Sequence, residues 1–195
     1  MLSMTANNSN EITRIHPHKF MLWVAIGGIC MMFAGLTSAY IVKRNQSNWQ
    51  DFDLPIVFWY STAVILLSSV TIQFAIRSLK SGAMGAYKSL IAMTAFLAII
   101  FTILQLVGFS NLKAHGIQLI GQGSNAAASF ILVITALHIV HVLGGVVALL
   151  IVFSKKLRST VDNKYNSTAI EIVSTYWHFV DVLWIYLFIF FMWIR

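Results

Sequence analysis

The stretch from Ile172 to Ile194 reads IVSTYWHFVDVLWIYLFIFFMWI. Apart from His178, its only acidic or basic side chain is Asp181. A helix needs about 20 consecutive apolar residues to cross the hydrocarbon core of a bilayer, and this stretch is long enough. Backbone groups inside hydrocarbon must find hydrogen-bond partners within their own segment, which favours a helix over an open sheet. The stretch therefore predicts a membrane-spanning helix.

The composition of the whole chain agrees with this prediction. Of its 195 residues, 58% are hydrophobic and only 10% are charged, whereas a soluble domain carries about 25% charged residues. So few charges exclude a water-soluble globule, and they also exclude a disordered chain. The net charge of +7 reflects a shortage of acids, so nucleic-acid binding is a poor fit. The single cysteine excludes a disulfide framework and a thiolate metal cage.

Four further segments are long and apolar enough to span a bilayer. They run from Phe20 to Val42, from Pro55 to Ile76, from Ser89 to Phe109 and from Ala128 to Phe153. We therefore expect an all-α, polytopic membrane bundle of five transmembrane helices. Residues 1–19 would form a polar N-terminal tail, and residues 20–195 would form one membrane domain. Pro55 is expected in the first turn of the second helix, where proline is favourable.

The segments that connect the spans predict the orientation of the chain. Most basic residues belong to the N-terminal tail, the second loop and the fourth loop: Arg14, Lys19, Arg77, Lys80, Lys88, Lys155, Lys156, Arg158 and Lys164. The opposite side has fewer: Lys43, Arg44, Lys113 and Arg195. Because positive residues are retained on the cytoplasmic side, we expect a cytoplasmic N-terminus and a C-terminus outside.

Ionisable side chains at membrane depth are costly and usually face the interior of a bundle. His138 and His141 lie three residues apart on the fourth span, and His178 and Asp181 lie three apart on the fifth, so each pair shares a helix face. Glu171 precedes His178 by seven residues on the same stripe. A rise of about 1.5 Å per residue puts His141 level with His178, and His138 level with Asp181. We expect a buried polar network of these five residues across the seam between the two helices.

Several roles are open for such a network. It could be structural, because hydrogen bonds between membrane helices contribute roughly 0.6–2 kcal/mol each. It could also relay protons or contact a lipid head group. A bis-histidine haem site would use His141 and His178, because imidazole is a usual axial ligand of haem. A copper or zinc centre would lack a thiolate or a carboxylate cluster to complete it.

Two motifs resemble the signatures of one protein family. The stretch from Glu171 to Trp184, EIVSTYWHFVDVLW, closely resembles the last-helix signature of subunit III of haem-copper terminal oxidases. The stretch from Thr135 to Gly145, TALHIVHVLGG, is similar to a second family motif, with His138 and His141 at its two histidines. The segment from Trp23 to Tyr40 resembles the first family helix that follows a variable leading hairpin.

The resemblance implies a five-helix form of this subunit, without the two leading helices of the seven-helix version. Such a subunit has no catalytic centre, haem or copper of its own; haem and copper belong to a partner, subunit I. It stabilises subunit I, binds phospholipid and supports proton uptake by a cytochrome c or quinol oxidase that reduces oxygen to water and pumps protons. The resemblance further implies other oxidase subunits and phospholipids as partners, no nucleic acid, and multi-pass insertion in the inner (cytoplasmic) membrane of a bacterium.

Two positions depart from the family pattern. Ile29 occupies the place where the family commonly has a buried carboxylate, and Ile139 replaces the glycine between the two family histidines. We therefore do not transfer any proton-related role of that carboxylate to this chain.

Two other functions compete with the oxidase subunit. One is a haem-binding, cytochrome-b-like membrane anchor. The other is a small proton-coupled transporter, which is disfavoured because the spans contain one carboxylate and no inverted pair of helices broken by Gly or Pro.

Overall fold

The computed structural model describes residues 17–44, 49, 52–121, 123–158 and 164–194. Within these residues the secondary structure is helical, and every helix is long and apolar enough to cross a membrane. The helices are α1 (Pro17–Lys43), α2 (Val57–Lys80), α3 (Met84–Ala114), α4 (Ala126–Arg158) and α5 (Lys164–Trp193). The predicted all-α class with five spans is therefore confirmed. The predicted N-terminal tail lies outside the described residues, except for residues 17–19, which begin α1.

Two of the helices end in glycine caps that the predicted spans did not include. After α3, Gly116 has a φ of 82°, and the N–H groups of Gly116 and Ile117 donate to the carbonyls of Lys113 and Leu112. This is the Schellman arrangement, in which glycine adopts a left-handed conformation at low steric cost. Gly82, with a φ of 77°, ends α2 in the same way. Both helices continue beyond the predicted spans, α2 to Lys80 and α3 to Ala114.

The prediction that Pro55 lies in the first turn of the second helix is wrong. α2 begins at Val57 with Ile56 as its N-cap, so Pro55 precedes the helix instead of lying in its first turn. The carbonyl of Pro55 accepts a hydrogen bond from the N–H of Phe58 at 3.0 Å, which makes the turn that leads into the helix.

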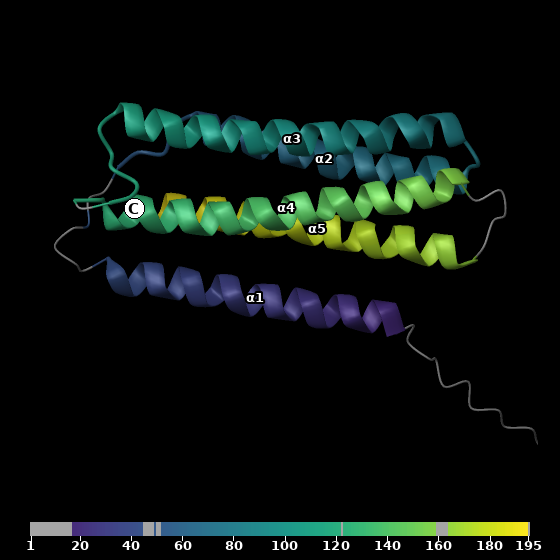
Figure 1. Ribbon diagram of the computed structural model, residues 1–195, viewed down its shortest axis with the longest axis horizontal. Helices are drawn as coiled ribbons and strands as arrows, with labels where there is room; N and C mark the ends of the chain where they lie inside the picture. Colours follow the sequence, from purple (N-terminus) through teal and green to yellow (C-terminus); the bar gives the residue numbers. More distant parts are fainter. Residues whose placement is uncertain (1–16, 45–48, 50–51, 122, 159–163, 195) are drawn as a thin grey trace, which may run out of the picture.

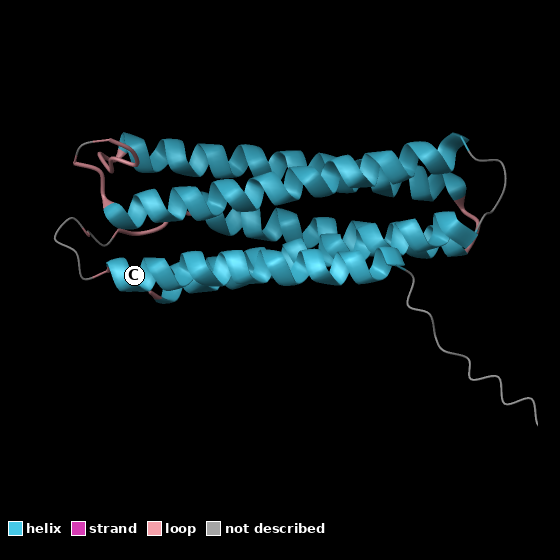
Figure 2. Cartoon of the chain, turned by 60° about the horizontal axis from the view of Figure 1, so that its bottom comes forward, coloured by secondary structure: helices cyan, strands magenta, loops and turns pink. Residues whose placement is uncertain are grey.

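Four of the helices form a ring. α2 packs against α3, α3 against α4, α4 against α5, and α5 against α2. Figure 1 shows the five helix axes running side by side along the length of the molecule, and Figure 2 shows the connecting loops gathered at its two ends. α1 lies outside the ring and packs against α4 and α5. We call the end where α1, α3 and α5 begin the Lys19 end, and the opposite end the Lys113 end.

An aromatic cluster fills the centre of the ring. The rings of Phe101 on α3, His138 on α4 and Trp184 on α5 have centroids 5.0 to 5.8 Å apart, and all three side chains are completely buried. Phe33 reaches the same imidazole from α1, at 6.4 Å. Since these contacts join four helices at one level, they hold His138 in place from three sides.

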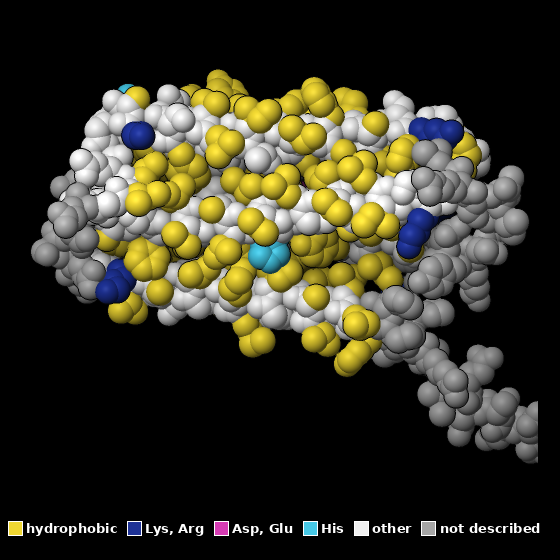
Figure 3. All heavy atoms as spheres, in the orientation of Figure 1, with side chains coloured by type: hydrophobic (Ala, Val, Ile, Leu, Met, Phe, Trp, Pro, Cys, Tyr) yellow, Lys and Arg dark blue, Asp and Glu magenta, His cyan; other side chains and the backbone are white. Residues whose placement is uncertain are grey.

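The outer surface is suited to a membrane. Figure 3 shows hydrophobic side chains along the middle of one face, with Lys and Arg confined to its two ends. Trp23, Trp59 and Trp193 lie near helix ends and are each more than half exposed. Indole side chains are enriched at the interface between membrane and water, which agrees with this placement.

Gly108 of α3 permits a close contact with Phe58 of α2, and this leads to a prediction. A Cβ atom on Gly108 would lie 2.7 Å from Cε2 of Phe58, a ring that is itself buried against Phe109. We expect Gly108→Ala to lower the free energy of unfolding by about 1–3 kcal/mol, the usual cost of overpacking. The thermal unfolding of the purified protein in detergent measures this effect.

The matched control is Gly85→Ala on the same helix, where no atom lies within 4 Å of the added Cβ. Because alanine favours a helix over glycine by up to about 1 kcal/mol, the control keeps or raises the melting temperature. Equal melting temperatures for the two variants would contradict the prediction.

Candidate functional site

Two indole groups of α5 bond to hydroxyl groups of α2. The N–H of Trp177 donates to Ser68 Oγ at 3.1 Å, and the N–H of Trp184 donates to Thr62 Oγ1 at 3.0 Å. A buried indole N–H requires a partner, since the bilayer core contains no water to replace one. These bonds fix both the distance between α2 and α5 and the rotation of α5 about its own axis.

His178 lies in the same interface and uses both of its ring nitrogens. Nδ1 is 2.7 Å from Ser69 Oγ, and Nε2 is 3.3 Å from Gln73 Oε1. An amide oxygen only accepts, so the tautomer that satisfies both contacts has its proton on Nε2 and accepts from the Ser69 hydroxyl through Nδ1. The Asp181 carboxyl lies beside the same hydroxyl oxygen, whose one hydrogen this tautomer gives to His178. His178, Ser69 and Asp181 are thus one linked group between α2 and α5.

The expected pairing across α4 and α5 is corrected by this arrangement. The two helices are neighbours, which the expected pairing required. However, neither ring nitrogen of His138 has a hydrogen-bond partner among the described residues, so the His138–Asp181 bond is absent there. His178 faces α2 and does not pair with His141. The physical reason is rotation: counting residues sets the level of a side chain along the axis, but not the direction in which it points.

The side of α5 that faces α4 has different side chains. The hydroxyl of Tyr176 donates to the backbone carbonyl of His141 at 3.1 Å. A Cβ on Gly145 would lie 3.2 Å from the Tyr176 ring and 3.3 Å from the Trp177 ring. Small residues permit helices to approach closely in membranes, so α4 and α5 are joined mainly by aromatic packing on glycine.

His141 and Glu171 lie apart from the linked group. Nδ1 of His141 is 2.7 Å from the carbonyl of Leu137 on its own helix, and its ring packs 5.7 Å from that of Phe33 on α1. Glu171 pairs with Lys19 of α1 at 3.1 Å, and both side chains are nearly half exposed. Such an exposed pair contributes at most about 1 kcal/mol. The structure therefore brings His178 and Asp181 together through Ser69, and leaves His138, His141 and Glu171 in separate surroundings.

Sequence reasoning missed the partners that α2 supplies. Hydroxyl residues recur on this helix at intervals of seven, as Ser61 with Ser68 and Thr62 with Ser69, and Gln73 follows Ser69 by four. This spacing puts them on neighbouring faces of one helix, and polar side chains within a span often bond to other helices. The repeat was the signal that could have identified α2 as the partner of α5.

α2 also bonds to α3 through the same class of side chain. Gln105 Nε2 donates to Ser61 Oγ at 2.8 Å, and the hydroxyls of Thr71 and Thr94 lie 2.8 Å apart. α2 is therefore the helix on which side-chain hydrogen bonds from both neighbours converge.

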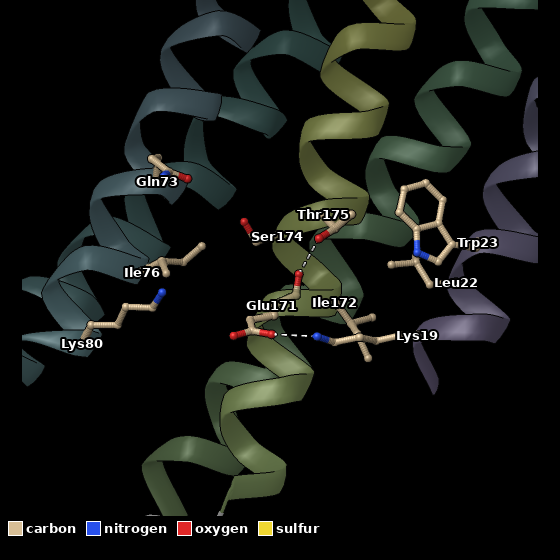
Figure 4. Close-up of a pocket in the computed structure, with 10 residues that line it drawn as sticks. All are labelled: Lys19, Leu22, Trp23, Gln73, Ile76, Lys80, Glu171, Ile172, Ser174 and Thr175. Carbon is tan, nitrogen blue, oxygen red and sulfur yellow. Dashed lines mark hydrogen bonds and ion pairs between the residues drawn. The ribbon is translucent and has the colours of Figure 1, made fainter. Parts of the chain in front are cut away.

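A cavity of about 430 Å³ opens at the Lys19 end, between α1, α2 and α5. Figure 4 shows Glu171 between two ammonium groups: Lys19 from α1, with which it pairs, and Lys80, which reaches in from α2. Gln73 and Ser174 add an amide and a hydroxyl to the wall. This mixture of charged and polar groups at a helix end contrasts with the apolar surface along the spans.

The linked group at α2 and α5 makes a second prediction. Ser69→Ala removes the partner that His178 Nδ1 and the Asp181 carboxyl share. We expect the free energy of unfolding to fall by about 1–2 kcal/mol, because buried polar atoms lose their hydrogen bonds. Ser154→Ala is the control, since that exposed hydroxyl bonds only to the carbonyl of Ile151 on its own helix. Equal melting temperatures for the two variants in detergent would refute a stabilising role for the group.

Comparison with known proteins agrees with the motifs. The model of the family described as cytochrome c oxidase subunit III matches residues 46–195. Cytochrome c oxidase subunit 3 of Corynebacterium diphtheriae is 32% identical over 166 residues, which cover 82% of this chain and 79% of that protein. The probable cytochrome c oxidase subunit 3 of Mycobacterium tuberculosis is 29% identical over 200 residues, covering 96% and 97% of the two chains.

A quinol oxidase subunit is also similar. The cytochrome bo(3) ubiquinol oxidase subunit 3 of Pseudomonas aeruginosa is 26% identical over 194 residues, covering 93% of this chain and 90% of that protein. The family model extends over most of the chain and includes four of the five helices in full. The chain therefore belongs to the cytochrome c oxidase subunit III family, the third subunit of haem-copper oxidases.

Proposed function

We propose that this chain is a non-redox subunit that stabilises subunit I of a respiratory oxidase, the enzyme that reduces oxygen to water and pumps protons, and supports its proton uptake. The observation that carries the proposal is the surroundings of His178, whose two ring nitrogens both contact side chains of α2. An imidazole engaged in this way serves helix packing and is not free to bind a metal. Haem and copper would then belong to the partner subunit.

The positions of the histidines argue against the alternative of a haem-binding anchor. A bis-histidine site requires two imidazoles that face each other across one haem. His141 packs against Phe33 of α1, whereas His178 contacts α2, so the two rings point toward different helices. His138 is enclosed by the rings of Phe33, Phe101 and Trp184, which occupy the space that a haem would need.

The charges at the two ends support the proposed orientation. Lys19 and Lys80 line the cavity at the Lys19 end, in the region where basic residues are most numerous. The excess of basic residues supports a cytoplasmic position for this end, with the C-terminus outside. Because the similar oxidase subunits come from bacteria, we propose insertion in the inner membrane.

The same cavity is the observation that supports the proposed binding of phospholipid. It lies at the ends of three membrane helices, at the depth where lipid head groups are found. An ammonium group complements a phosphate, and Lys80 has no ion-pair partner among the described residues that line the cavity. Glu171 complements a positively charged amine in the same head group. We propose that a phospholipid head group occupies this cavity, with its acyl chains along the apolar surface of α1 and α5.

Removal of this chain tests the structural role. An oxidase purified without it should keep its haem and copper content per subunit I, and should lose activity faster during continued turnover or melt at a lower temperature. The measurements are the absorption spectrum, the metal content and oxygen consumption over time. A stoichiometric Soret band in the isolated chain would instead establish the haem-binding alternative.

The lipid proposal makes a separate prediction. In the complete oxidase, Lys80→Ala should reduce the amount of phospholipid that remains bound after purification, because the cavity loses a cation that faces the phosphate. Lys113→Ala, at the opposite end of the bundle, is the control of equal charge change. Quantitative mass spectrometry of retained lipid checks the result. Equal retention by the two variants would show that the cavity does not hold a phospholipid through Lys80.

A further inference from the structure

Four buried side chains inside the ring have polar atoms without a hydrogen-bond partner among the described residues. These atoms are Gln105 Oε1, Thr135 Oγ1, both ring nitrogens of His138, and Asp181 Oδ2. None of the four side chains is more than 3% exposed. They come from α3, α4 and α5, the three helices that meet at the central aromatic cluster.

The ring contacts of His138 and the register of the helices place these residues within about one turn of His138 along the bundle. The His138 ring touches Phe101 of α3 and Trp184 of α5, at 5.8 and 5.1 Å between centroids. Gln105 lies one turn after Phe101 on the same face of α3, toward the Lys113 end. Thr135 lies one turn from His138 in the same direction, since α4 runs opposite to α3. Gln105 and Thr135 are therefore level with each other, about one turn from the imidazole toward the Lys113 end.

Asp181 lies on the other side of the imidazole. It precedes Trp184 by one turn on α5, and so lies toward the Lys19 end. Its carboxyl lies beside Ser69, which contacts His178, which in turn contacts Gln73. Gln73 lines the cavity at the Lys19 end, beside Ile76 and Lys80 (Figure 4). Polar side chains therefore form a series along the bundle that begins at the cavity and reaches the level of Gln105.

The hydroxyl of Thr135 behaves differently from those of comparable threonines in this chain. In Thr37, Thr62, Thr94 and Thr102 the hydroxyl donates to the carbonyl four residues earlier on its own helix. A threonine within a span usually satisfies its hydroxyl in this way. Thr135 makes no such bond, although it is completely buried. Its hydroxyl is therefore available to a group that lies between the helices.

We propose that the interior of this bundle binds water at His138. One molecule would lie among Gln105 Oε1, Thr135 Oγ1 and the imidazole, and a second would join the imidazole to Asp181 Oδ2. A buried water molecule typically makes two to four hydrogen bonds to polar groups that otherwise lack partners. The donors and acceptors present suit water, because a neutral imidazole offers one of each, a hydroxyl offers both, and the amide oxygen accepts.

The proposed water molecules would complete a hydrogen-bonded path from the cavity to the centre of the bundle. Beyond them, Gln105 Nε2 donates to Ser61, whose hydroxyl donates to the carbonyl of Phe58 on its own helix. The path ends there within the described residues. It is therefore a hydrogen-bonded path with one end at the cavity, and it differs from a route across the membrane. This inference is independent of the lipid and of the structural role proposed above.

A density map of the complete oxidase, at a resolution that reveals ordered water, tests the proposal. We expect a peak within hydrogen-bond distance of a ring nitrogen of His138 and of Thr135 or Gln105. In the same map of Thr135→Val this peak should disappear or move, because the variant keeps the shape of the side chain but lacks its hydroxyl. Thr102→Val is the matched control and should retain the peak, since that hydroxyl bonds to the carbonyl of Ala98.

The proposal is overturned if the wild-type map shows no peak there, if His138 bonds directly to Asp181, or if the peak is unchanged in Thr135→Val. Melting temperatures test the proposal with variants for which no density map is obtained. The loss of melting temperature in Thr135→Val with Gln105→Leu should be smaller than the sum of the two single losses, because both side chains hold one water molecule. Additive losses for Thr135→Val with Gln105→Leu would contradict a shared site.

Discussion

The lack of hydrogen-bonding groups in the hydrocarbon of the bilayer is the constraint on which the rest of this structure depends. A polar group inside the spans has to find its partner within the protein or in water bound there. α2 supplies most of those partners: its hydroxyls bond to Gln105 and Thr94 on α3, and to both indoles and His178 on α5. These bonds determine which helices are adjacent, and they set the rotation of each helix about its axis. Aromatic packing around His138 then fills the remaining space.

The polar residues of the chain fall into two classes with different surroundings. Those deep in the bundle, such as His178 and Asp181, are used between helices, where each is held by a neighbouring hydroxyl. Those at the Lys19 end, such as Glu171 and Lys80, line an open cavity at the helix ends, where we propose that a lipid head group binds. The first class holds the helices of the bundle together, and the second lies at the ends of its helices.

Much of the fold was predictable, and the candidate site was predictable in part. Apolar length alone predicts the five spans, and the packing of α4 against α5 meets the condition for a network between them. The sequence predicts partners on α4 for His178 and Asp181, whereas in the structure both side chains lie beside Ser69 of α2. The hydroxyl repeat in α2 is a weak signal because serine and threonine are common in membrane helices, where their hydroxyls usually donate to carbonyls of their own helix. Only a partner helix distinguishes Ser69, which bonds across the interface, from Ser154, which does not.

The amino-acid sequence by itself determined the number of helices and their approximate ends. These properties depend on apolar length and on a constant rise per residue, both of which are measured along a single helix. The tertiary structure alone decided that α1 lies outside a ring of four helices, and that His178 and Asp181 face α2 while His138 is enclosed by aromatic rings. Those properties depend on how each helix is rotated toward its neighbours. That rotation follows from which hydrogen bonds and ring contacts all the helices can satisfy together.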